Sequence, residues 1–335
     1  MKKTASTASI ALTITFCILI VGCTSEPTGE VVASEKLTIG TGLGPAATLL
    51  LVADDQGFFD QQHLNVEVVG FTAGKFAMQA FLAGSLDLAA SGEVPVMYSS
   101  MAGNEFVVIS QLVERTVGEV RIVARSDGDL NEPKEYFMAK KRKLATSFGG
   151  GPEFYTSEFL KKHGIEDVEI ISQKPEDMPA ALASGSVDAV AIFEPFATFS
   201  EQKLGDAGIT FIDEDLYSEL FVLNAHREWV QQHPEKAEAL MRALVAAGAY
   251  IETNPEEAKA VLMRHTNLDK RTVDSMWDNF VFRPALNPRL MEYLEAEAKW
   301  AIETGKVATG SAAPDFSEYI WTASLSNVAP HAVTI

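Results

Sequence analysis

Cysteine is almost absent from this chain. Its 335 residues include two cysteines, Cys17 and Cys23, and both lie close to the amino terminus. Removal of residues 1–22 would discard Cys17 and leave Cys23 as the first residue. The remaining body has no thiol for a disulfide, a thiolate nucleophile or a zinc site, which excludes cysteine chemistry.

Short catalytic and cofactor motifs are missing as well. The six histidines are scattered, with no pair at metal-ligand spacing. The run Gly40–Gly44 begins like a dinucleotide-binding loop, but Pro45 stands where the third glycine of G-x-G-x-x-G is required. No G-x-S-x-G elbow, Walker loop or H-E-x-x-H motif occurs. We therefore expect no metal, no cofactor and no enzymatic activity.

Positive charge is scarce. Lys and Arg number 27 against 46 Asp and Glu, a net charge of -19, and loss of Lys2 and Lys3 with a leader makes it two more negative, -21. An acidic surface repels nucleic-acid phosphates and anionic headgroups. We expect no nucleic-acid partner, and a membrane would be reached through lipid instead of basic patches.

The amino-terminal segment has the features of a leader. Lys2 and Lys3 precede an apolar run from Ile10 to Val21, and small Gly22 stands before Cys23. This pattern resembles the bacterial lipoprotein lipobox, with residues 1–22 as signal peptide, a lipidated Cys23 and a polar tether over 23–35. The alternatives are an ordinary signal peptide or a short membrane span, but a span needs about 18 apolar residues. The prediction is a lipid-anchored, extracytoplasmic protein.

Short β-branched runs alternate with helical patterns from Lys36 onward, which is typical of a parallel sheet flanked by helices. A first α/β lobe is expected to contain strands at 37–39, 64–69, 86–90 and 106–112. After an extended crossover and a turn at 126–129, a second lobe is expected to contain strands at 144–148, 168–172 and 189–193.

A strand at 219–224 then leads back, and the chain from Pro234 onward is predicted to be almost entirely helical. The predicted organisation is an α/β protein with lobe 1 formed by residues 36–124 and 219–330 and lobe 2 formed by residues 125–218. Gly84-Ser85-Leu86-Asp87 in one lobe matches Gly185-Ser186-Val187-Asp188 in the other. We interpret both as helix caps feeding strands, a structural role for the two aspartates, and as evidence for paired lobes.

Polar or glycine loops directly precede predicted helices in both lobes. These loops are Leu43-Gly44-Pro45, Thr72-Ala73-Gly74-Lys75, Ser91-Gly92-Glu93 and Gly149-Gly150-Gly151-Pro152. Helix amino termini present unpaired N–H groups that accept anionic oxygens, and three consecutive glycines suit close approach of a ligand to the main chain. Lys75 and Arg115 would add positive charge, while Glu93 or Glu194 could hold a ligand ammonium or ring N–H. Ordinary helix capping is the alternative explanation of each loop.

Several ordered segments resemble one known family. They are Gln56–Phe59, Leu64–Val68, Phe71–Gly74, Ala83–Ala89, Phe148–Gly150 and Ile192–Phe196. Together they resemble the nitrate/sulfonate/taurine-type substrate-binding proteins of ABC importers, a family that includes binders of thiamine pyrimidine precursors. The resemblance covers about Lys36 to Leu204. By position it implies that Leu43, Gly44, Thr72, Gly74, Ser91, Gly92, Gly149, Gly150 and Glu194 face an interlobe cleft.

The resemblance further implies a two-lobed flytrap fold of the type II periplasmic-binding-protein class, with a helical carboxyl-terminal tail. It implies a monomer that captures a small anionic or zwitterionic organic solute and delivers it to a permease driven by an ATPase subunit. Two alternatives stay open. One is an enzyme on the same scaffold, acting on a small heterocycle with Glu93 or Glu194 as acid or base. The other is a sensory or adhesive lipoprotein.

Overall fold

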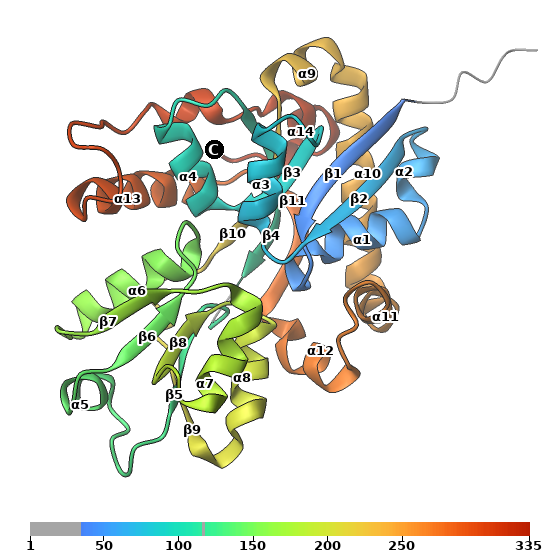
Figure 1. The fold of residues 1–335 in the computed structure, drawn as a ribbon. Coiled ribbons are helices and arrows are strands. Elements are labelled where there is room, and N and C mark those ends of the chain that lie inside the picture. Colours follow the sequence, from blue (N-terminus) through green and yellow to red (C-terminus); the bar gives the residue numbers. More distant parts are fainter. Residues whose placement is uncertain (1–34, 116–117) are drawn as a thin grey trace, which may run out of the picture. The chain divides into compact units, whose positions relative to one another are not determined.

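The computed structural model describes residues 35–115 and 118–335, and within them the strands form two mixed sheets (Figure 1). The first sheet has the order β11-β4-β10-β3-β1-β2. Its strands are β1 Lys36–Gly42, β2 Asn65–Phe71, β3 Leu88–Gly92, β4 Val107–Arg115, β10 Leu220–Ala225 and β11 Phe280–Ala285. β1 runs parallel to β2 and β3, whereas β10 pairs antiparallel with β3 and β4.

The second sheet repeats this plan with the order β7-β6-β8-β5-β9. Its strands are β5 Arg121–Arg125, β6 Lys143–Thr146, β7 Glu169–Ser172, β8 Ala189–Ile192 and β9 Gly208–Phe211. β6 is parallel to β7 and β8, and β5 is antiparallel to β8 and β9. Each sheet therefore places a parallel triplet beside an antiparallel strand that arrives from the other lobe, in place of the all-parallel sheet expected from the sequence.

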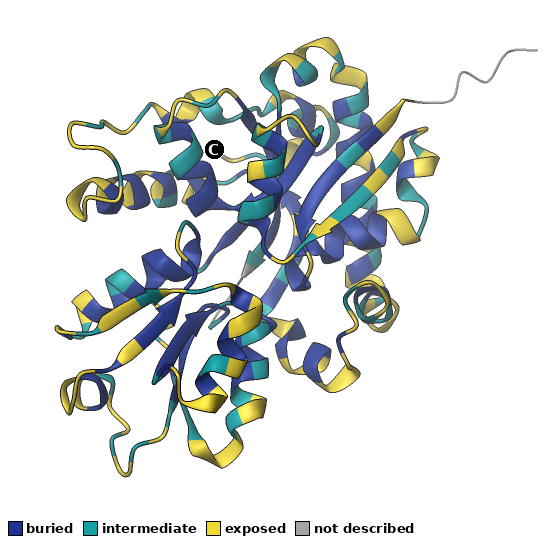
Figure 2. Cartoon of the chain, in the orientation of Figure 1, coloured by how far each residue is buried: buried dark blue, intermediate teal, exposed yellow. Residues whose placement is uncertain are grey.

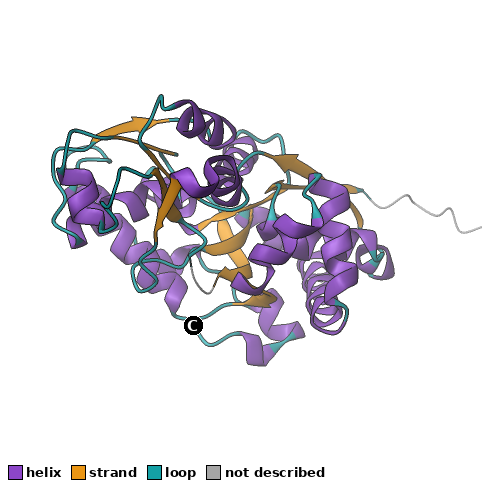
Figure 3. Ribbon diagram, turned by 90° about the horizontal axis from the view of Figure 1, so that it is seen from below, coloured by secondary structure: helices purple, strands orange, loops and turns teal. Residues whose placement is uncertain are grey.

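Helices cover both sheets (Figure 3). The first lobe carries α1 Thr48–Asp55, α2 Phe58–Gln61, α3 Gly74–Leu82, α4 Glu93–Met101, α9 Arg227–Gln232, α10 Pro234–Thr253, α11 Pro255–Thr266, α12 Lys270–Met276, α13 Arg289–Glu303 and α14 Ala323–Val328. The second lobe carries α5 Pro133–Met138, α6 Gly151–Lys162, α7 Met178–Ser184 and α8 Phe196–Leu204. α3 packs on β1 and β3, and α6 packs on β6 and β8.

The two aspartates of the repeated turn have matching structural roles. Asp87 Oδ2 accepts hydrogen bonds from Thr38 N at 2.7 Å and Thr38 Oγ1 at 2.6 Å, which fixes β1 beside β3. Asp188 Oδ2 accepts one from Lys143 N at 2.8 Å, which fixes β6 beside β8. The preceding glycines, Gly84 and Gly185, have φ values of 75° and 78° and end their helices in the left-handed region. The structural interpretation of these turns is confirmed.

The central strands β5 and β8 of the second sheet are buried almost throughout (Figure 2), and their side chains alternate between two core clusters as the strand period requires. Ile122 and Ala124 of β5 belong to the large core cluster, while Val123 between them faces a smaller cluster formed with α7 and α8. β8 follows the same rule, with Ala191 on one face and Val190 on the other. β5 and β8 are therefore covered on both faces, which explains why they are short, mostly apolar runs.

Two expectations about the path of the chain need correction. β5 (Arg121–Arg125) pairs with β8 and β9 of the second sheet, so a lobe boundary after Ala124 is wrong and the crossover precedes β5. The tail from Pro234, predicted to be almost entirely helical, also contains β11, which is an edge strand beside β4. β11 contains Pro284, which cannot donate to a ladder and is tolerated at a sheet edge. Because a proline within a run argues against a strand, the sequence pattern did not predict β11.

The leader, the predicted lipidation site Cys23 and the tether up to residue 34 lie outside the described residues. In the part of the chain that the structure describes, no helix combines the length and the apolar character needed to cross a bilayer.

Candidate solute-binding site

The carboxyl ends of the parallel strands converge on one cavity between the lobes, the arrangement expected for open α/β sheets. We call this cavity the head chamber. Nine of the predicted residues line it, namely Leu43, Gly44, Thr72, Gly74, Lys75, Gly92, Gly150, Gly151 and Glu194. The volume open to the centre of a water molecule is about 40 Å³. The lobes are thus close together around a small space.

Three helices begin at the head chamber without a side-chain cap. They are α3, α4 and α6, whose N-cap residues are Ala73, Gly92 and Gly150. The first two helices belong to the first lobe and α6 to the second. Their first-turn N–H groups and the positive ends of their dipoles meet at the same space. This arrangement suits a group with several anionic oxygens.

Lys75 connects the two lobes at the edge of this chamber. Its Nζ donates to Ser147 Oγ and to the Phe148 carbonyl oxygen, both at 2.8 Å. Burial lowers the pKa of Lys75, and the nearby Glu153 and Glu176 carboxylates partly offset that effect. The positive end of the α3 dipole repels an ammonium group at the start of the helix. The hydrogen bonds of Lys75 to the second lobe compensate for this repulsion.

The three consecutive glycines, Gly149, Gly150 and Gly151, differ in backbone conformation and in the space around them. Gly149 has a φ of 77° and donates its N–H to Glu153 Oε2 at 2.8 Å, so it forms the turn and does not line the head chamber. A Cβ on Gly150 would meet its neighbours at 3.7 Å or more, which is ordinary contact. A Cβ on Gly151 would lie 2.5 Å from Tyr217 Oη. Gly151 therefore permits the close approach of α6 to Tyr217.

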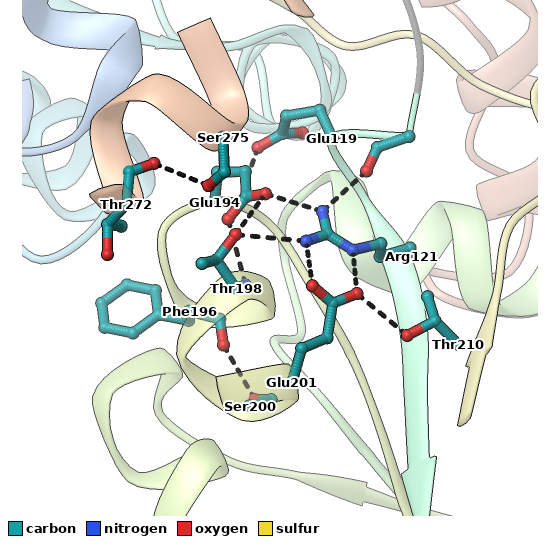
Figure 4. A network of polar contacts seen from close by, with 11 residues as sticks. Glu119, Arg121, Glu194, Phe196, Thr198, Ser200, Glu201, Thr210, Thr272 and Ser275 are labelled. Carbon is teal, nitrogen blue, oxygen red and sulfur yellow. Dashed lines mark hydrogen bonds and ion pairs between the residues drawn. The ribbon is translucent and has the colours of Figure 1, made fainter. Parts of the chain in front are cut away.

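Glu194 lines the chamber mainly as part of a wall, because its carboxylate is fully engaged elsewhere (Figure 4). Glu194 Oε1 accepts from Arg121 Nη1 at 2.7 Å, and Glu194 Oε2 accepts from Thr198 N at 3.1 Å. Burial alone lowers the pKa of Arg121, but the carboxylates of Glu201 and Glu194 raise it overall. The expectation that Glu194 holds a ligand ammonium is not supported by this geometry.

Glu93 is fully buried and also points away from the head chamber. Its Oε1 accepts from the Tyr217 hydroxyl, and its Oε2 accepts from Leu220 N at 2.8 Å. Burial, followed by repulsion from Glu219, raises the pKa of Glu93 to about 8. Burial and the proximity of Glu93 raise the pKa of Glu297 well above its ordinary value. Neither Glu93 nor Glu194 is placed for acid or base chemistry on a solute.

Two other predicted residues do not line the head chamber. Ser91 is buried in β3, where its Oγ accepts from Asn224 Nδ2 at 3.1 Å. Its role is therefore to join neighbouring strands. Arg115 ends β4, and its side chain lies outside the described part of the chain. Among the described residues, no group of His, Cys, Asp and Glu is arranged to hold a metal ion.

The structure adds site residues that the sequence did not indicate. Ser147 follows β6 at the same sheet edge and could have been found by the strand-end argument. Glu219 and Phe221 line the chamber at the beginning of β10. They lie there because β10 runs antiparallel to β3 and pairs Phe221 with Gly92. In a parallel sheet the first residues of a strand lie at the edge opposite the binding site, so the sequence did not indicate these two residues as site residues.

The sequence profile of the NMT1-like family matches residues 32–264. The chain belongs to the NMT1-like family. One relative is a Bacillus subtilis (strain 168) protein named for binding aliphatic sulfonates. It is 25% identical to this chain over 286 residues, which cover 83% of each of the two chains.

Solved structures confirm the fold of this NMT1-like family member. The periplasmic aliphatic sulphonate binding protein SsuA from Escherichia coli has a TM-score of 0.73 at 20% identity, covering 88% of this chain and 98% of that one. The periplasmic nitrate-binding protein NrtA from Synechocystis PCC 6803 has a TM-score of 0.72 at 15% identity, covering 89% of both chains. These solved structures confirm the predicted α/β two-lobed fold. The relatives are named as binding proteins and not as enzymes.

Proposed function

We propose that this chain is the solute receptor of an ABC importer and captures a small organic anion or zwitterion of the sulfonate, nitrate or taurine-like class between its lobes. The observation that carries the proposal is the meeting of three uncapped helix amino termini, α3, α4 and α6, at one interlobe chamber. Relatives named for sulfonate and nitrate binding support the same chemistry.

Capture follows from contributions of both lobes to one site. Ala73 and Gly92 present helix ends from the first lobe, and Gly150 presents one from the second. A solute that bridges these ends binds the closed form more tightly than the open form, and the closed population rises by that difference in affinity. No bond is made or broken, and a permease with its ATPase subunit would receive the solute.

A thermal-shift panel tests the ligand class. Sulfonates, nitrate, carboxylates, amino acids and pyrimidines are each added to the purified protein. A bound solute at about 100 times its dissociation constant stabilises the folded protein by about 2.7 kcal/mol. We expect the oxyanion-bearing solutes to raise the melting temperature. A shift with pyrimidines alone would contradict the proposed class.

We also propose that Cys23 carries a lipid anchor that holds this receptor at a bacterial membrane. Two or three acyl chains suffice for stable anchoring, since each buried methylene contributes about 0.8 kcal/mol. Cys23→Ser is expected to move the protein from the membrane fraction to the soluble fraction, as followed by immunoblotting. An anchor elsewhere is indicated if the variant stays in the membrane fraction to the same extent as the unaltered chain.

A further inference from the structure

The head chamber is too small for more than the charged end of an organic solute. By the same measure a single water molecule needs about 10–15 Å³, so about 40 Å³ holds about three waters. Three oxygens of a sulfonate would occupy that space. Any longer solute must extend beyond the chamber.

A second and larger cavity adjoins the head chamber. It offers about 360 Å³ by the same measure and shares Lys75 and Pro95 with the head chamber. We call it the side chamber. Its walls come from α3 and α4 of the first lobe and from the Phe148–Gly149 turn of the second. Lys75 and Pro95 thus stand at the boundary of the two cavities, so a solute that binds beside Lys75 with its remainder directed along this boundary would reach the side chamber.

The walls of the side chamber are fixed by a buried carboxylate. Glu153, 7% exposed as a side chain, accepts from Lys306 Nζ at 2.6 Å and from Gly149 N at 2.8 Å. Lys306 follows α13 of the first lobe, and Glu153 lies in α6 of the second. One side of the cavity is thus bordered by an ion pair between the lobes, whose carboxylate is buried.

The lining of the side chamber favours an uncharged ring. Phe148 is 38% exposed, one of the large apolar side chains that the described protein leaves accessible, and Tyr98 contributes a second aromatic group. Lys306 Nζ lies 4.8 Å from the Phe148 ring centroid. Two ammonium groups, Lys75 and Lys306, face one carboxylate there, so the net charge disfavours an ammonium tail.

We propose that the side chamber is a subsite for the uncharged aromatic or cyclic end of an elongated organic sulfonate whose charged end occupies the head chamber. The subsite rests on the proposed function, since it requires a solute in the head chamber. With this subsite, the protein is expected to prefer a ring-bearing sulfonate over nitrate, a short alkanesulfonate or an aminoalkanesulfonate.

Calorimetric titration of the full chain, purified in detergent, tests this subsite with three probes. They are methanesulfonate, 3-aminopropanesulfonate and 3-phenylpropanesulfonate. We expect the phenyl compound to bind about 10-fold more tightly than methanesulfonate, because burial of ring surface is favourable, and the amino compound to gain nothing. Equal affinities for all three would overturn the subsite and leave the proposed function standing. Binding of none would overturn both.

Two variants locate the effect. Phe148→Ala removes exposed apolar surface from the side chamber, and Gln79→Trp, at an exposed position on α3, fills it. Each should remove most of the phenyl preference while changing methanesulfonate affinity less than about 2-fold. Ile170→Ala, at an exposed position on β7, is the matched control and should keep the preference. Equal losses for both sulfonates in the two chamber variants would contradict the assignment.

Discussion

Gly151 lies where α6 of the second lobe comes closest to Tyr217. A Cβ at this position would stand 2.5 Å from Tyr217 Oη. A side chain on residue 151 would therefore hinder the close approach of the two lobes and would leave the interior of each lobe undisturbed. Tyr217 cannot easily yield, since its hydroxyl donates to buried Glu93 and its ring packs against Phe154 at 5.5 Å.

Gly151→Ala is therefore expected to weaken solute affinity by about 10-fold or more, because about 1.4 kcal/mol of lost closure corresponds to that factor. Titration calorimetry measures it. Lys161→Ala, at an exposed position of the same helix, is the matched control and should keep the affinity of the unaltered protein. Closure does not depend on this contact if both variants bind like the unaltered protein.

The buried carboxyl pair of Glu93 and Glu297 gives the protein a pH dependence. The pKa of Glu93 is raised from 4.5 to about 8, so between these values the folded state keeps a proton that the unfolded state has released. Its contribution to stability is complete below pH 4.5 and is lost as the pH rises through about 8. The free energy of unfolding should fall over this window by an amount on the order of 5 kcal/mol.

Glu297→Gln places a neutral amide beside Glu93 in place of a carboxyl whose pKa is raised by burial and by Glu93. This variant is expected to flatten the fall in unfolding free energy between pH 4.5 and pH 8, as measured by urea denaturation. Glu295→Gln, at an exposed position on the same helix, should leave the slope unchanged. An identical slope in the Glu297 variant and the unaltered protein would show that the pair does not titrate in this range.

At the scale of elements, β5 and the start of α8 are joined by the Arg121 network (Figure 4). Arg121 donates to Glu201 at 2.8 and 2.9 Å, to Glu194 at 2.7 Å and to the Gly118 carbonyl oxygen at 2.9 Å. It thereby links the crossover before β5 to the wall of the head chamber. The arginine is buried, so its partners depend on it for neutralisation.

Removal of this arginine should be costly. Arg121→Met leaves Glu194 buried without its cation, and we expect a loss of about 3–5 kcal/mol in unfolding free energy by urea denaturation. Arg125→Met at the end of the same strand, where the side chain bonds helix carbonyls, should cost less than half as much. Adding Glu194→Gln to Arg121→Met should restore part of the loss. A loss below about 1 kcal/mol in the Arg121 variant would contradict the network's importance.

The strands of the two parallel triplets could be predicted because apolar runs between glycine-capped helices have a clear period, as at β1, β3 and β8. The loops after those strands could be predicted as site residues for the same reason. The roles of Glu93 and Glu194 could not, because a carboxylate after a strand looks the same whether it faces a solute or a buried partner such as Arg121. Glu219 was missed because its place depends on the antiparallel direction of β10.

At the scale of the whole molecule, direct polar contacts join the two lobes in addition to the contacts that the proposed solute would make with both of them. Lys75 bonds Ser147 and Phe148, and Lys306 pairs with Glu153 at 2.6 Å. Gln202 of α8 donates to Thr272 of α12 at 3.2 Å. These contacts make a closed arrangement accessible, and the solute's affinity for both half-sites would then set its population.

The central claim is that helix ends from both lobes bind an oxyanion, and titration calorimetry of Gly150→Asp tests it most directly. Gly150 lines the head chamber, and an added carboxylate there opposes an anionic solute. The account predicts saturable binding of an organic sulfonate to the unaltered chain, loss of at least about 100-fold in affinity in the variant, and an unchanged melting temperature without solute. Equal sulfonate affinity in both proteins would contradict it.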